Sequence, residues 1–122
     1  HVYLPPQPTP RRCYAWGKAL REILDARPER IVLLASGGMS HYPGTDRYAS
    51  PDFDWDRQML ATLTAGRGAE TARLTGEELD KAGNVELRTW ITLLGAVGDA
   101  RAEVLCYEPS WHHGNAVVEW PV

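Results

Sequence analysis

The sequence has few cysteines, no long apolar run and no strong charge of either sign. Cys13 and Cys106 are too few for a disulfide framework, so we expect two reduced thiols in a cytoplasmic protein. The apolar runs are far too short to span a membrane, and the first residues lack the basic flank and apolar core of a signal peptide. The formal net charge is −3, with both signs mixed along the chain, so we expect neither a nucleic acid partner nor a disordered acidic arm.

What is present fits one compact domain of 122 residues with an ordinary share of apolar side chains. The first ten residues, HVYLPPQPTP, start without methionine and contain four prolines, a composition typical of an extended connector. We therefore expect residues 1–9 to be a proline-rich connector, and residues 10–122 to be one portion of a larger unit.

Helical spacing is clear at the start of this portion. Thr9 followed by Pro10 predicts a helix N-terminus, and Pro28 ends the pattern. Apolar residues recur at helical spacing between them and are expected to face the core: Cys13, Trp16, Leu20, Ile23 and Leu24.

Three further helices are predicted downstream. The first covers residues 52–64, and the second is a short helix with a capping box of Thr75 and Glu78. The third covers residues 85–97, with Asn84 as its N-cap and Trp90 in the core.

Strands are predicted in three places. The segment RIVLLAS, residues 30–36, is apolar on both faces, as in a strand covered on two sides. AEVLCYE and NAVVEW predict two strands joined by the turn PSWHHG. The expected class is α/β, with a mostly buried mixed sheet flanked by helices.

Glu86 is the first candidate site residue. It lies on the apolar side of the predicted 85–97 helix, in line with Trp90 and Leu94. Because an unpaired buried carboxylate is costly, Glu86 needs a partner. The residues leave two roles open: an edge glutamate that turns to solvent or caps a backbone amide, or a metal ligand.

His41 is the second candidate, in the segment ASGGMSHYPGTD. A histidine in a glycine-rich loop can simply be a structural turn residue. However, it stands just beyond the carboxyl end of a predicted strand, where open α/β sheets place their sites. Glycines before it also allow the backbone to approach a ligand closely. Both roles remain open from the residues alone.

Taken together, ASGGMSH and AGNVELRTWITLLGA resemble the C-terminal part of the class III extradiol ring-cleavage dioxygenases. This is the superfamily of protocatechuate 4,5-dioxygenase and the dihydroxyphenylpropionate dioxygenases. The segment PDFDWDRQML and the closing YEP…W stretch are also similar to that family. The resemblance extends from about Thr9 to the end of the chain.

The resemblance implies extradiol (meta) cleavage of a catechol-type aromatic by non-haem Fe(II) and O₂. His41 would be the acid/base and Glu86 an iron ligand, while Ser40 and Tyr42 would contact the substrate or shape the loop. The family also uses two iron-binding histidines from its N-terminal half, and no histidine here has a matching context: His1, His41, His112 and His113. We therefore expect a second subunit or an N-terminal segment to supply both ligands, in an oligomeric enzyme.

A small α-helical or structural interaction protein is the default that only the joint motif argues against. Two further alternatives stay open. One is a relative with the same fold that has lost its iron and serves as a non-catalytic subunit or a binding or regulatory partner. The other is a zinc site made by Cys106, His112 and His113, although no fourth ligand has the usual spacing.

Overall fold

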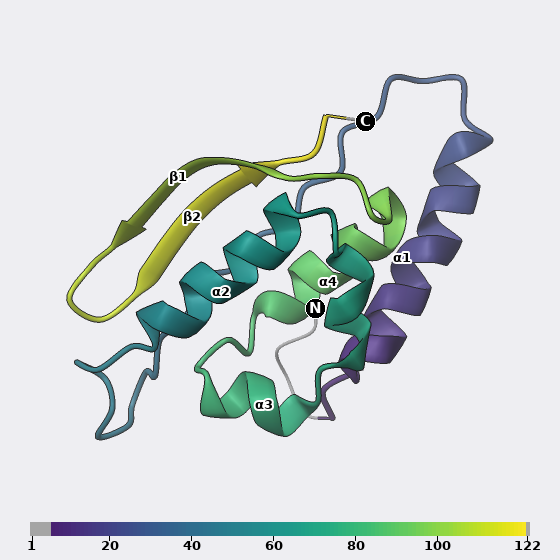
Figure 1. The fold of residues 1–122 in the computed structure, drawn as a ribbon. Coiled ribbons are helices and arrows are strands. Elements are labelled where there is room, and N and C mark those ends of the chain that lie inside the picture. The colour runs from purple at the N-terminus through teal and green to yellow at the C-terminus, as the bar shows by residue number, and fades with distance from the viewer. Residues whose placement is uncertain (1–5, 122) are drawn as a thin grey trace.

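The computed structural model describes residues 6–121 and contains helices and a small sheet (Figure 1). The elements in chain order are α1 (Pro10–Asp25), α2 (Phe53–Thr64), the 3-10 helix η1 (Gly68–Arg73), α3 (Gly76–Lys81), α4 (Leu87–Val97), β1 (Glu103–Pro109) and β2 (Gly114–Glu119). The mixed α/β class is confirmed. Residues 1–5 of the expected connector lie outside the described part. Within the described part, no helix is long and apolar enough to cross a membrane.

Side-chain caps set three of the helix starts. Thr9 accepts a hydrogen bond from the backbone N–H of the third residue that follows it, at the start of α1. Asp52 caps α2 in the same way. The predicted capping box of Thr75 and Glu78 is present at α3. Such caps satisfy backbone donors that have no partner inside the helix.

The predicted cap at Asn84 is wrong. Helix α4 begins at Leu87, and its N-cap residue, Glu86, makes no side-chain capping bond. The amide of Asn84 instead donates to the carboxylate of Asp56 at 3.0 Å. A second hydrogen bond from this amide, to the carbonyl of Ala82 at 3.1 Å, fixes the side chain further. A capping residue accepts a backbone N–H with its side-chain oxygen, whereas Oδ1 of Asn84 has no hydrogen-bond partner among the described residues.

Helices α1 and α4 cross where two glycines meet. A Cβ on Gly17 would overlap the carbonyl oxygen of Thr92, and a Cβ on Gly95 would overlap that of Tyr14. This close crossing turns Cys13 and Gly17 toward α4 and leaves Trp16 64% exposed. The expectation that Trp16 lies in the core is therefore wrong, because backbone contact at the glycines decides the rotation of α1 rather than its apolar periodicity.

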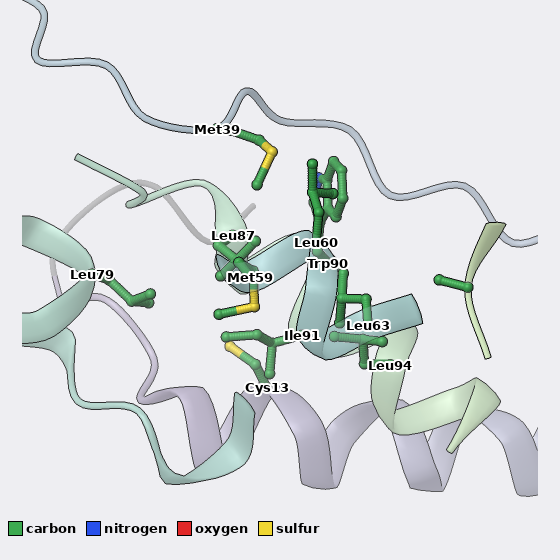
Figure 2. Close-up of a cluster of buried hydrophobic side chains, with 11 residues drawn as sticks. Cys13, Met39, Met59, Leu60, Leu63, Leu79, Leu87, Trp90, Ile91 and Leu94 are labelled. Atoms are coloured by element: carbon green, nitrogen blue, oxygen red, sulfur yellow. The ribbon is translucent and has the colours of Figure 1, made fainter. Parts of the chain in front are cut away.

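The core lies between α1, α2 and α4, and Figure 2 shows Cys13 of α1 and Ile91 of α4 within one cluster. Trp90 is buried there, as expected. The other members are aliphatic or sulfur-containing side chains: Met39, Met59, Leu60, Leu63, Leu79, Leu87, Leu94 and Ala102. This packing supplies a rigid base for the loop and helix end that carry the candidate site.

The sheet differs from the expectation. Within residues 6–121 it has two strands, β1 and β2, which pair antiparallel, so a mostly buried mixed sheet is not formed by the described residues. Residues 30–36 are extended but pair with no described strand, and Val32 and Leu34 are 82% and 87% exposed. The segment has the local preference of a strand, but a strand also needs a neighbour to pair with.

Candidate functional site

The loop after this extended segment places His41 beside helix α4. Nδ1 of His41 lies 2.7 Å from the carbonyl oxygen of Met39, and its backbone N–H donates to Gly83 at 3.0 Å. The carbonyl can accept only from a protonated Nδ1, so Nε2 is the nitrogen left to accept a proton. Nε2 lies 3.9 Å from Oε1 of Glu86, and the two side chains are 17% and 32% exposed.

Glu86 stands at the N-terminus of α4 with its two oxygens in different surroundings. Oε2 accepts a 2.7 Å hydrogen bond from the backbone N–H of Gly38, while Oε1 faces His41. The helix dipole also favours a negative charge at this position. The carboxylate therefore has the partner that its position requires, and one oxygen remains available to a cation.

The two glycines before His41 are required by close contacts. Gly37 has a φ of 147°, and a Cβ there would lie 2.8 Å from the Cβ of Glu86. A Cβ on Gly38 would overlap the ring of His113. Without side chains at these two positions, the loop can lie directly against both neighbours.

His113 is a neighbour of the site that we did not predict. Its ring centroid lies 4.5 Å from that of His41, with the rings tilted by 54°. Its Nε2 is buried without a hydrogen-bond partner among the described residues. Burial, and secondarily the positive charge of His41 when protonated, lower the pKa of His113. The sequence around His113 gives no signal of its contact with His41, because the hairpin turn meets the glycine loop only in the folded chain.

Ser40 and Tyr42, the weaker candidates, flank His41 and are both buried. The hydroxyl of Ser40 accepts from the backbone N–H of Asp52 at 2.5 Å. The hydroxyl of Tyr42 donates to the carbonyl of Lys81 at 2.7 Å. In this structure both hydroxyls therefore hold the loop to neighbouring segments.

Within residues 6–121 no three His, Cys, Asp or Glu side chains are placed to hold a metal ion. The alternative zinc site of Cys106, His112 and His113 is therefore not formed by the described chain. What the site does offer is an imidazole with one free nitrogen beside a carboxylate with one free oxygen. An imidazole exchanges protons readily near neutrality, and a carboxylate is a common ligand of divalent iron.

The sequence of this chain matches a known protein family. Residues 1–118 match the family described as "Catalytic LigB subunit of aromatic ring-opening dioxygenase". The chain is 35% identical over 101 residues to a gallate dioxygenase from Pseudomonas putida, covering 75% of this chain and 28% of that protein. It is 29% identical over 120 residues to the 2-aminophenol 1,6-dioxygenase beta subunit from a Pseudomonas species, covering 85% of this chain and 39% of that subunit.

The chain thus spans well under half the length of these two curated relatives. The family match nevertheless includes the loop of His41, the start of α4 and the hairpin turn that bears His113. This chain belongs to the LigB family of aromatic ring-opening dioxygenases, the class III extradiol enzymes.

Proposed function

We propose that this chain carries the acid/base and the carboxylate metal ligand of an extradiol dioxygenase that opens catechol-type rings. The observation that carries the proposal is the pairing of His41 Nε2 with Glu86 Oε1 at 3.9 Å, at the junction of a glycine loop and a helix N-terminus. The family match and both relatives' names support ring opening as the reaction.

Glu86 would hold the iron through Oε1, since Oε2 is already bonded to the backbone of Gly38. Ferrous iron with one carboxylate and two histidine ligands leaves open positions for a catechol and O₂ and makes the catechol hydroxyls more acidic. His41 would take a hydroxyl proton at Nε2 and return it when the ring opens. Its bond to the Met39 carbonyl keeps Nδ1 protonated and the ring oriented for both steps.

The ligand set suits iron, but it is incomplete in the described residues. We propose that the two histidine ligands come from a second subunit or from another segment of the enzyme. Three findings support this: the chain spans 28% and 39% of two relatives, one relative is named a beta subunit, and residues 30–36 have no strand partner among the described residues.

An apolar groove beside residues 30–36 also supports a further segment. The groove has a volume of about 910 Å³ and lies between that extended segment, α1, α4 and β2. Its lining includes Leu24, Val32, Leu34, Leu93 and Val117. The backbone of residues 30–35 makes no hydrogen bond to another backbone group within residues 6–121. A strand from the remainder of the enzyme would satisfy those groups and cover the exposed side chains.

The test is to purify the chain with its natural partner, measure iron and partner content by native mass spectrometry, and follow ring opening of a catechol and an aminophenol panel under O₂. We expect about one iron per pair of chains and a ring-opened product with at least one substrate. A complex that binds no iron and opens no ring would refute the proposal and favour a non-catalytic subunit or regulatory relative.

A further inference from the structure

Asp56 is a buried carboxylate at the point where four segments meet. It lies on α2 and is fully buried. Its oxygens accept from the backbone N–H of Ser40 at 3.0 and 3.2 Å, from the side-chain amide of Asn84 at 3.0 Å, and from the hydroxyl of Tyr107 at 3.1 Å. The donors come from the glycine loop, the turn before α4, and β1. One side chain therefore joins α2 to three other segments.

Two of these donors are close in sequence to the proposed site residues. Ser40 is bonded directly to His41, and Asn84 lies two residues before Glu86. The two segments also contact each other, because the N–H of His41 donates to the carbonyl of Gly83 at 3.0 Å. The carboxylate thus lies between the loop that carries the acid/base and the turn that carries the proposed metal ligand.

The surroundings leave Asp56 little freedom. A Cβ on Gly114, at the start of β2, would overlap Oδ2 of Asp56, so the strand backbone lies against the carboxylate. Gly114 also donates its N–H to the carbonyl of Ser40 at 2.9 Å. The start of β2, directly after His113, is therefore fixed to the same point. Each interaction sets the position of a segment, and none of them reaches the free atoms of the site.

Burial makes this arrangement costly for stability. Desolvation raises the pKa of Asp56, although hydrogen bonds from Asn84, Ser40 and Tyr107 act in the opposite direction. A buried charge is a poor device for stabilising a fold, because well-packed apolar groups do as well or better. Buried, fully bonded polar groups are better suited to specifying one arrangement of the elements around them.

We propose that Asp56 is a positioning residue that sets the separation between His41 Nε2 and Glu86 Oε1. The proposal rests on the proposed function, since it assigns a role in that same site. Asp56 does not touch the substrate; it acts through the backbone of Ser40 and the side chain of Asn84. A displacement of about 1 Å between reacting groups can slow turnover on the order of 100-fold, so such a residue affects the rate strongly.

The test compares Asp56→Asn with two controls in the enzyme purified with its partner. Asp54→Asn makes the same change on the same helix at a side chain that is 89% exposed. Leu63→Ala removes packing at the other end of α2, from a fully buried residue away from the carboxylate. We measure kcat, KM, melting temperature, and hydrogen exchange of the Ser40 amide.

In Asp56→Asn, one carboxylate oxygen becomes an NH2 group. That donor would lie opposite at least one N–H or O–H group that donates to Asp56 in the wild type. We expect kcat to fall on the order of 10- to 100-fold with KM nearly unchanged, and the Ser40 amide to lose protection from exchange. Asp54→Asn is expected to keep both properties. Leu63→Ala should lower the melting temperature while keeping kcat and the protection of Ser40.

Wild-type kcat together with wild-type Ser40 protection in Asp56→Asn would overturn the proposal. So would an equal loss of kcat in Leu63→Ala, because a general loss of stability would then explain both. If Asp56→Asn fails to fold, Tyr107→Phe removes one donor and keeps the carboxylate; unchanged kcat and unchanged Ser40 exchange there would also overturn it. A wild-type enzyme that opens no ring refutes the proposed function alone, since Ser40 exchange still tests the positioning.

Discussion

The backbone N–H of Gly38 donates a 2.7 Å hydrogen bond to Oε2 of Glu86, although 48 residues separate them in the chain. This bond draws the glycine loop against the start of α4 and leaves Oε1 facing His41. The proposed acid/base and the proposed metal ligand are thus held by the backbone of one loop.

Gly37→Ala should lower the free energy of unfolding by more than the cost of placing alanine at a positive φ. The matched control is Gly44→Ala, because Gly44 also has a positive φ, 75°, but a Cβ there meets nothing within 4 Å. We expect a loss of about 1 kcal/mol in the free energy of unfolding for Gly44→Ala. Gly37→Ala should lose about 2–4 kcal/mol, since its Cβ also meets Glu86. Urea denaturation measures both, and equal losses would contradict the contact.

His41→Phe should separate proton transfer from metal binding. Removing Nε2 removes the proposed proton acceptor, so we expect kcat to fall on the order of 10²- to 10⁴-fold. Iron content should stay at the wild-type level, because His41 is not assigned as a ligand. The matched control is His112→Phe, in the hairpin turn. Steady-state oxygen uptake with metal analysis tests this, and unchanged turnover in His41→Phe would exclude His41 from proton transfer.

Glu86→Gln should weaken the iron site and keep the fold. The glutamine carbonyl can still accept from Gly38, so the melting temperature should change little. Loss of the anionic ligand should lower iron affinity on the order of 10- to 100-fold in the complex with the partner. Glu103→Gln, at an exposed position of β1, is the control. Equal iron affinity in the two variants would remove Glu86 from the proposed ligand set.

His113 should make the stability of the chain depend on pH. Burial lowers its pKa below 6.5, so the unfolded chain binds this proton first as the pH falls. Its contribution to stability is therefore complete above pH 6.5 and is lost as the pH falls through 6.5 toward the folded-state pKa. In His113→Asn, the free energy of unfolding should decline less between about pH 7.5 and about pH 5. Urea titrations across this range, with His112→Asn as control, test the assignment; an unchanged decline in His113→Asn would contradict it.

Much of the local structure could be predicted because its signals are local. Thr9 with Pro10 and the Thr75–Glu78 pair mark helix starts by side-chain chemistry within one turn of the chain. The hairpin of β1 and β2 follows from two alternating segments around a short turn. These features depend on few residues outside themselves.

The features that were missed depend on distant contacts. The exposure of Trp16 follows from the approach of Gly17 to Gly95, which no spacing within α1 reveals. The side chain of Asn84 is held by a carboxylate 28 residues earlier in the chain instead of capping α4. Periodicity and cap signals describe one segment at a time, so they cannot report which segment will lie against it.

The candidate site lies between these two cases. The resemblance to the dioxygenase family predicted His41 and Glu86 as site residues. In the structure, Nε2 of His41 lies 3.9 Å from Oε1 of Glu86. Asp56 and His113 gave no comparable signal, since their importance comes from which segments they touch. The contacts that position a site are therefore harder to read from a sequence than the groups assigned to its chemistry.

Residues 30–36 also bear on how the chain behaves when it is concentrated. The backbone of residues 30–35 makes no hydrogen bond to another backbone group within residues 6–121. Such an extended apolar segment is a template for addition of any compatible strand, including the same segment of another copy. Glu29 lies just before the segment and Arg30 is its first residue, but no charged side chain lies between Ile31 and Ala35. Self-association of the purified chain should therefore rise with concentration and fall when a partner segment covers residues 30–36. Aggregation and assembly of the enzyme would then use the same surface.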